Sequence, residues 1–169
     1  MVTLSRSEFE TLRKHGVNQM AQDKQLIQDA LDLKVKAGRY LWVHQTTWRG
    51  EPCLQLPQDL FAVAEIVHDT QPQIIIELGV AWGGSFLFYD DLATRYGGYV
   101  LGVDKYVPSG LKTRLYPKCR STFSTILEGD STDGHIVAMV IVATVGLKTL
   151  LILDSDHTHD HVLSELRLY

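Results

Sequence analysis

Residues 74–85 of this chain read IIIELGVAWGGS, and this stretch decides the fold class. The three isoleucines at 74–76 are β-branched and indicate a short buried strand. A glycine-rich turn follows from Gly79 to Gly84, and Ser85 stands where the N-cap of a following helix is expected. Because backbone at a glycine can approach a ligand closely, and a helix N-terminus offers free N–H groups, this order is typical of a ligand-binding α/β domain.

The strand–helix order recurs toward the C-terminus. Further strands are expected at residues 99–103, 124–127 and 149–153, and helices at 133–145 and 157–168. Apolar strands that alternate with helices predict a parallel sheet covered on both faces, here a partial sheet of about four strands in an α/β, Rossmann-like fold.

An amphipathic helical region is predicted upstream of this domain, at residues 5–36, with a break near residues 15–16. We therefore divide the chain into an N-terminal helical extension and loop at residues 1–57 and an incomplete Rossmann-like domain at residues 58–169. The length of 169 residues suits one domain.

The composition excludes several classes of protein. A net charge of −4 without basic clusters argues against a nucleic-acid partner. The two cysteines show no spacing typical of disulfide frameworks or zinc sites, and the N-terminus has no apolar signal core, so a cytoplasmic location is expected. The apolar segment 136–153 approaches the length of a membrane span, but residues 146–148 divide it, and we interpret it as a buried helix followed by a central strand.

The glycine turn matches neither common nucleotide fingerprint. Ala81 replaces the second glycine of GxGxxG, and Ser85 stands where the Walker motif requires lysine. The pattern that remains begins with Glu77, and a carboxylate at a strand end suits a ligand with ammonium or hydroxyl groups better than a bare pyrophosphate. The alternative is a turn that only connects a strand to a helix.

Three aspartates follow the other expected strands, namely Asp104, Asp130 and Asp154. Ligands of open parallel sheets bind outside the carboxyl ends of the strands, so these acids are expected to line one crevice. An acid in the position of Asp104 accepts hydrogen bonds from ribose hydroxyls in nucleotide-binding domains. For each aspartate alone, a turn or a helix cap is the simpler explanation.

Residues 153–161 read LDSDHTHDH and are dense in metal-ligating side chains. Carboxylate oxygens suit magnesium, and imidazoles suit zinc or iron. The zinc motif HExxH is absent, so we expect a metal at Asp154 and not a histidine-based zinc site. The alternative is a helix cap with solvated histidines.

A set of motifs resembles the cephalosporin hydroxylase family, whose relatives include rhamnosyl O-methyltransferases. The motifs are WxGxP at 48–52, QxPxD at 55–59, ExG at 77–79, GGS at 83–85, GxD at 102–104 and LDSxHTxxHVLxEL at 153–166. The resemblance covers about residues 47–169 and implies a class I methyltransferase fold, S-adenosylmethionine (SAM) as cofactor and a magnesium-assisted O-methyl transfer.

The resemblance also implies roles for single residues. Asp104 would bind the ribose, Asp154 the metal, and His157 would be the base that accepts the proton. The expected cofactor-binding residues are Glu77, Gly79, Gly83, Gly84, Ser85, Asp104, Asp130 and Ser131, of which Asp130 and Ser131 would contact the adenine.

This sequence departs from the family's pattern at two points, and two rival functions stay open. The remaining metal carboxylates of the family would lie beyond Tyr169, so an incomplete metal site and sheet are expected. The helix at 136–145 is almost wholly apolar, which favours a homo-oligomer. The rivals are a non-catalytic fragment and an NAD- or iron-dependent oxidoreductase. The acceptor is expected to be a small hydroxylated compound, such as a sugar or an antibiotic-like molecule.

Overall fold

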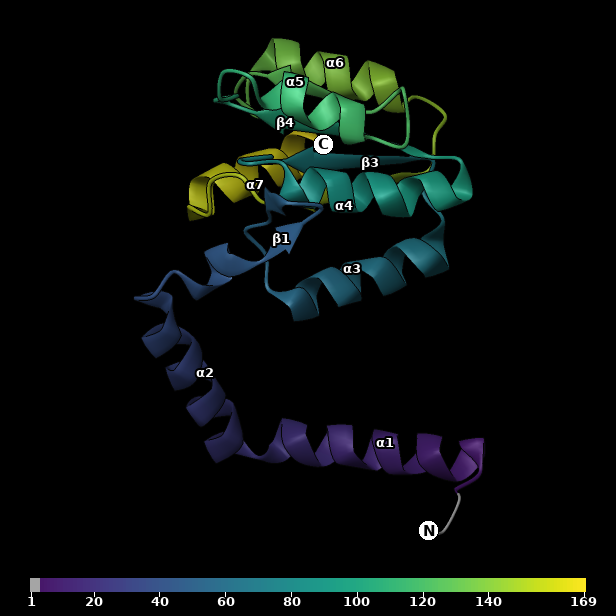
Figure 1. Cartoon of the computed structure of the whole chain (residues 1–169), viewed down its shortest axis with the longest axis vertical. Coiled ribbons are helices and arrows are strands. Elements are labelled where there is room, and N and C mark those ends of the chain that lie inside the picture. The colour runs from purple at the N-terminus through teal and green to yellow at the C-terminus, as the bar shows by residue number, and fades with distance from the viewer. Residues whose placement is uncertain (1–3) are drawn as a thin grey trace. The chain divides into compact units, whose positions relative to one another are not determined.

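Figure 1 shows a computed structural model of the chain, which describes residues 4–169. Contacts between residues divide the chain into two units. The first ends at Trp42, and the second spans Val43–Tyr169 and contains the sheet.

The first unit holds two helices, α1 (Arg6–Gln22) and α2 (Lys24–Gly38). The helices are separated at Asp23, whose side chain accepts a hydrogen bond from the Leu26 amide at 3.0 Å and caps α2. The break expected near Gly16 was therefore wrong, since a glycine inside an exposed helix costs only about 1 kcal/mol. Neither helix buries a residue.

The second unit is built on four strands, β3 (Ile74–Leu78), β4 (Tyr99–Asp104), β5 (Thr125–Glu128) and β6 (Thr149–Leu153). They are all parallel and lie in the order β5-β4-β3-β6. This confirms the predicted four-stranded parallel α/β fold. The expected central position of β6 was wrong, because β6 pairs only with β3 and forms an edge of the sheet in the described part of the chain.

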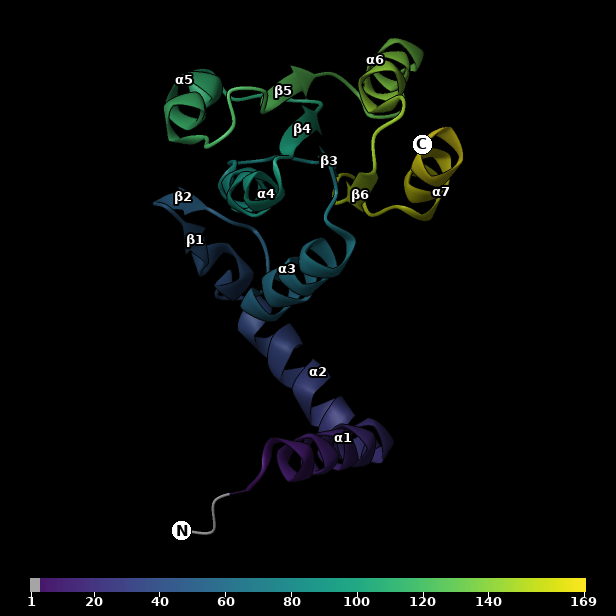
Figure 2. The same cartoon turned by 90° about the vertical axis from the view of Figure 1, so that its right-hand side faces the viewer.

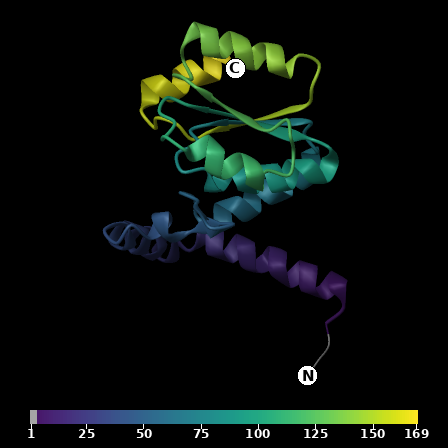
Figure 3. The same ribbon diagram turned by 45° about the horizontal axis from the view of Figure 1, so that its top comes forward.

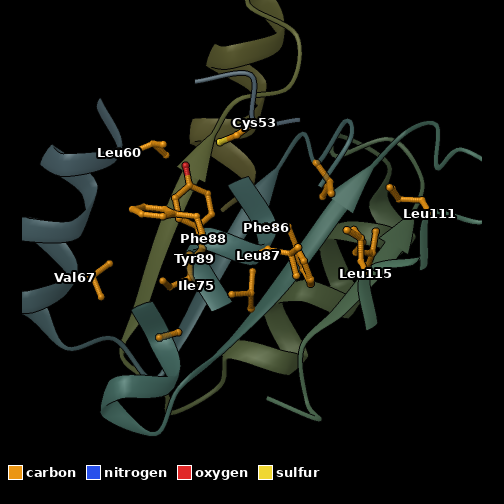
Figure 4. Packing of buried hydrophobic residues seen from close by; sticks show 14 residues of the cluster. Cys53, Leu60, Val67, Ile75, Phe86, Leu87, Phe88, Tyr89, Leu111 and Leu115 are labelled. Carbon is orange, nitrogen blue, oxygen red and sulfur yellow. The ribbon is translucent and has the colours of Figure 1, made fainter. Parts of the chain in front are cut away.

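Helices cover both faces of the sheet, as Figure 2 shows. One face carries α3 (Pro57–Thr70), α4 (Gly84–Ala93) and α5 (Leu111–Leu115), and the other carries α6 (Gly134–Thr144) and α7 (His159–Leu168) (Figure 3). Strand side chains alternate between the two faces. Ile75 therefore packs in the cluster on the α4 side, drawn in Figure 4, and Ile74 and Ile76 pack toward α6.

A small hairpin precedes α3 and belongs to the sheet unit. Its strands are β1 (Thr47–Trp48) and β2 (Glu51–Pro52), and a 3-10 turn at Trp42–Gln45 leads into it. Trp48 packs edge-on against Phe88 of α4 at 4.9 Å and donates a hydrogen bond to Asp91 at 2.8 Å. These contacts place residues 43–57 with the sheet, whereas the boundary expected from the sequence lies at residue 57. Further 3-10 turns lie at Thr94–Tyr96 and Tyr116–Lys118.

Helices α4 and α6 begin in different ways. Gly83 is the N-cap of α4, so Ser85 lies inside the helix and the expected cap at Ser85 was wrong. Asp133 caps α6 as expected, accepting hydrogen bonds from the amides of His135 and Ile136.

Helix α6 is apolar on both of its sides but buries only one. Ile136 and Val140 pack on the sheet, Val137 is also buried, and Val142 is 74% exposed. The helix that was expected to be buried is therefore a surface helix with an apolar outer face. No helix within residues 4–169 is both long enough and apolar enough to span a membrane.

Candidate functional site

A cavity of about 580 Å³ opens at the carboxyl ends of the four parallel strands. Its volume lies within the range typical of small-molecule sites. Every strand contributes to its wall, because parallel strands end at the same edge of a sheet. The lining includes Pro52, Leu54, Gly79, Val80, Ala81, Ser85, Asp104, Lys105, Asp130, Ser131, Asp154, Ser155, Asp156, His157 and His161.

Asp104 at the end of β4 holds the glycine loop that follows β3. Its Oδ2 atom accepts hydrogen bonds from the amides of Val80 and Ala81, each at 2.8 Å. Its Oδ1 atom accepts a third, from the Tyr106 amide at 2.9 Å. The carboxylate thus joins the loops after two neighbouring strands and fixes the shape of the cavity floor.

The three glycines of the loop allow close packing. A Cβ atom on Gly79 would lie 2.1 Å from the Asp154 carbonyl oxygen, and one on Gly84 would lie 2.3 Å from the Pro52 carbonyl oxygen. A Cβ atom on Gly83 would collide with the Leu115 side chain, and Gly83 has a φ of 86°. Of these glycines only Gly79 lines the cavity, so the structure gives Gly83 and Gly84 a packing role.

Glu77 lies under the glycine loop and is fully buried. Neither of its carboxylate oxygens has a hydrogen-bond partner within residues 4–169. Burial, together with the nearby charges of Asp154 and Asp104, raises the pKa of Glu77 to about 8. The Ser85 hydroxyl opposes this rise without reaching hydrogen-bonding geometry. Glu77 is therefore largely protonated at neutral pH and lies outside the cavity wall.

Asp154 after β6 is the half-buried acid of the cavity. The Gln55 amide donates a hydrogen bond to its Oδ2 atom, and the His157 Nε2 atom lies 3.5 Å from its Oδ1 atom. Burial raises the pKa of Asp154 to about 6, against the opposing effects of His157 and Gln55. The His157 side chain itself is 78% exposed.

Asp130 after β5 is already engaged by neighbouring groups. The Lys105 ammonium lies 2.9 Å from its Oδ2 atom, and both the amide and the hydroxyl of Thr132 donate to its Oδ1 atom. The bond from Lys105, followed by those from Thr132, holds the pKa of Asp130 well below its usual range. Asp130 thus presents a paired, permanently ionised carboxylate to the cavity.

A buried cluster on α7 lies beside the cavity. The Glu165 Oε1 atom accepts hydrogen bonds from the hydroxyls of Ser131 and Ser155, each at 2.5 Å. The His161 Nε2 atom lies 3.1 Å from that same oxygen and 3.1 Å from the Ser131 hydroxyl. The Tyr169 hydroxyl donates to the Ser131 carbonyl at 2.7 Å. Glu165 is fully buried.

The structure brings seven of the ten predicted site residues to the cavity wall. These are Gly79, Ser85, Asp104, Asp130, Ser131, Asp154 and His157; Glu77, Gly83 and Gly84 lie behind the wall. Lys105, His161 and Glu165 were missed as site residues. The spacing of His161 and Glu165 places them one helical turn apart, a signal that was present in the sequence. Within residues 4–169, no three potential metal ligands converge.

A family model described as Rhamnosyl O-methyltransferase/CmcI matches residues 40–169. This range covers well over half of the chain. The chain belongs to the rhamnosyl O-methyltransferase/CmcI family. Membership confirms the resemblance drawn from the motifs at 48–59, 77–85 and 153–166, all of which lie within the matched range.

Curated members of the rhamnosyl O-methyltransferase/CmcI family are similar over the same region. The rhamnosyl O-methyltransferase of Mycobacterium leprae (strain TN) is 32% identical over 135 residues, which are 78% of this chain and 56% of that protein. The protein of the same name from Mycobacterium tuberculosis (strain CDC 1551 / Oshkosh) is 31% identical over 136 residues, 78% of this chain and 53% of the relative. The chain spans about half the length of the curated relatives it matches.

Two solved structures of CmcI are also similar to this chain. One, of CmcI with SAH, has a TM-score of 0.49 and 22% identity, and the match covers 73% of this chain and 58% of that chain. The other, of CmcI with Mg-SAM, has a TM-score of 0.47 and 22% identity, and the match covers 69% and 48%.

Proposed function

We propose that this chain carries the SAM-binding part of an O-methyltransferase, with the cofactor in the cavity at the carboxyl ends of β3–β6. Family membership supports the reaction class. The observation that supports this location is the glycine loop, because Asp104 fixes its amides at a cavity that all four strands line.

The chemistry of the wall fits this cofactor. SAM has a positive sulfonium and an ammonium group, and the wall presents the carboxylates of Asp104, Asp130 and Asp154. A carboxylate has about four lone-pair sites, and Asp104 uses three for backbone amides, which leaves one for a ribose hydroxyl. Direct contacts from Glu77, Gly83 and Gly84 stay predictions, since these residues lie behind the wall.

The proposed reaction is an in-line displacement in which the acceptor oxygen forms a bond to the methyl carbon as the methyl–sulfur bond breaks. When bound, SAM supplies the methyl group and a neutral thioether leaving group. The cavity would accelerate the methyl transfer chiefly by holding the acceptor and the donor close together and aligned. His157 stays the proposed proton acceptor, because it lines the cavity and lies exposed at its edge.

Magnesium assistance is a separate proposal, with Asp154 as the ligand. A carboxylate with a pKa of about 6 is ionised above neutral pH, and magnesium binds through one or two carboxylates while it keeps several waters. Within the described residues no three potential ligands converge at Asp154 or elsewhere, so we derive no step through the metal.

We further propose a small hydroxylated acceptor, such as a sugar or an antibiotic-like molecule, a homo-oligomer and a cytoplasmic location. The exposed apolar face of α6 supports association between copies. Both Cys53 and Cys119 are free thiols, which suits a reducing compartment.

Calorimetric titration of the 169-residue chain with S-adenosylhomocysteine tests the proposed function, with NAD as the competing cofactor. We expect saturable binding of S-adenosylhomocysteine and none of NAD, and a loss of binding in Asp104→Ala. Asp160→Ala is the matched control, because the Asp160 side chain is almost fully exposed and outside the cavity. Binding of NAD alone would favour an oxidoreductase, and binding of neither would contradict a cofactor role for this chain.

A further inference from the structure

The cluster around Glu165 connects the two outer strands of the sheet. Ser131 follows β5 and Ser155 follows β6, and these strands lie at opposite edges of the described sheet. Both serine hydroxyls donate to one oxygen of Glu165. One buried carboxylate on α7 therefore fixes the loops on the two sides of the cavity. Both hydrogen bonds are short, at 2.5 Å.

This arrangement determines the protonation of the His161 Nε2 atom. The Ser131 hydroxyl gives its proton to Glu165, so the Ser131 oxygen can only accept toward His161. The Glu165 oxygen is an acceptor as well. A ring nitrogen that faces two acceptors must carry a hydrogen. Neutral His161 is therefore the Nε2–H tautomer, with a lone pair on Nδ1.

The second ring nitrogen points away from the buried cluster. The two nitrogens of an imidazole project from opposite sides of the ring, and Nε2 projects toward buried Glu165. His161 lies in the first turn of α7, lines the cavity, and has 20% of its side chain exposed. In the described residues both hydrogen-bond contacts of the ring, to Ser131 and Glu165, are made by Nε2, which leaves Nδ1 for a group in the cavity.

We infer that His161 binds the nucleoside of the cofactor through Nδ1, with Glu165 as the positioning residue that fixes its tautomer and orientation. This rests on the proposed function. Nδ1 would accept a hydrogen bond from the amino group of the adenine or from a hydroxyl group of the ribose. His161 contacts Ser131 after β5, two strands away from the glycine loop after β3. The nucleoside, and not the amino-acid tail, is the part expected to reach it.

Two substitutions of His161 distinguish a role in cofactor binding from a role in stabilising the fold. The amide nitrogen of His161→Gln can take the place of Nε2 and keep the bonds to Glu165 and Ser131, but no acceptor stands at Nδ1. The amide of His161→Asn overlaps Nδ1 and offers an acceptor there, but does not reach Glu165. His159→Gln is the control, because the His159 side chain is 85% exposed and outside the cavity.

We expect His161→Gln to unfold at nearly the wild-type temperature yet to bind S-adenosylhomocysteine and adenosine about five- to tenfold more weakly. We expect His161→Asn to be less stable but to lose less affinity, and His159→Gln to change neither quantity. Nitrogen-detected NMR of the imidazole should find the hydrogen on Nε2.

The opposite order, with His161→Asn binding more weakly than His161→Gln, would give His161 a structural role only and overturn the inference. A hydrogen on Nδ1 in the neutral ring would also overturn it. Failure of the wild-type chain to bind S-adenosylhomocysteine would instead overturn the proposed function, and this assignment with it. A loss for S-adenosylhomocysteine without a loss for adenosine would place the contact outside the nucleoside and contradict the inference.

Discussion

The Asp104 carboxylate lies 2.8 Å from the backbone nitrogen of Ala81 and holds this residue in a left-handed conformation, with a φ of 46°. Such a conformation is uncommon for a residue with a side chain and requires support from its surroundings. The same carboxylate oxygen also accepts from the Val80 amide. The shape of the glycine loop thus depends on an acid from the next strand.

Replacement of Asp104 by asparagine should therefore destabilise the chain. The asparagine amide has only one acceptor oxygen, so either the pair Val80 and Ala81 or Tyr106 loses its hydrogen bond. We expect a loss of about 1–3 kcal/mol in the free energy of unfolding, measured by urea titration. Asp160→Asn should change this free energy by less than about 0.5 kcal/mol. Equal stability of Asp104→Asn and wild type would show that the loop keeps its shape without Asp104.

The first residues of α4 and α6 provide a matched pair of glycine substitutions. Gly84→Ala would place a Cβ atom 2.3 Å from the Pro52 carbonyl oxygen and 2.7 Å from the Cys53 Cα atom, both on backbone that cannot easily move. Gly134→Ala meets nothing within 4 Å. We expect the first to lower the free energy of unfolding by about 1–3 kcal/mol and the second to leave it unchanged or raise it slightly.

Denaturant unfolding of both variants under one condition provides the comparison. Similar effects of the two substitutions would mean that the β1–β2 hairpin does not pack against the start of α4 as closely as described. The same pair tests the packing role of Gly84. The added methyl group at position 84 contacts the hairpin and not the cavity, so its effect should appear in stability.

Glu77 should make the stability of the chain depend on pH. Its pKa of about 8 in the folded chain exceeds the value of 4.5 for an exposed glutamate, because the buried carboxyl keeps its proton. Between pH 4.5 and 8 the unfolded chain releases this proton and the folded chain retains it, so stability falls as pH rises through this window. Glu77→Gln has no carboxyl group to titrate, so its stability should not fall in this window. It should be more stable than wild type at pH 9, by on the order of a few kcal/mol.

Urea titrations of wild type and Glu77→Gln at pH 5 and pH 9 measure the effect. The difference between the two proteins should be small at pH 5 and largest at pH 9. The exposed Glu65→Gln serves as control and should show no such change with pH. A Glu77→Gln variant that follows the wild-type curve at every pH would mean that Glu77 ionises freely in the folded chain.

The sequence predicted the strands and their acids because these depend on local patterns. Apolar strands that end at or just before an acid, such as 99–104 and 149–153, were located within a residue or two. The N-cap of α4 was misplaced because the cap at Gly83 has no side chain to give a signal. The edge position of β6 was missed because strand order depends on crossover connections, which hydrophobic periodicity does not encode.

The candidate site was predictable at the level of residues but not of contacts. Asp104 was expected to bind a ribose, and its first role in the structure is to hold the glycine loop. Glu77 was expected in the cavity, and the alternation of β3 turns its side chain beneath the loop instead. Ser155 and Glu165 both lie in the motif at 153–166, but Ser131 is 34 residues away from Glu165, so the motif alone could not indicate the complete network.

The outer face of α6 should promote association between copies of the chain. Val142 on α6 and Val145 at its C-cap are each 74% exposed, beside the exposed Ile141 and Met139. A contiguous apolar patch on a surface helix is costly to leave in water, and contact between two copies would bury it.

We expect a molar mass that rises with protein concentration in sedimentation equilibrium, and the double substitution Val142→Lys and Val145→Lys should reduce it toward the monomer value. Because both side chains point to solvent, these changes should leave the melting temperature nearly constant. The equally exposed Val35→Lys on α2 is the control for added charge. A wild-type chain that is monomeric at all concentrations would contradict the proposed homo-oligomer, and a mass that falls equally in the control would locate association away from α6.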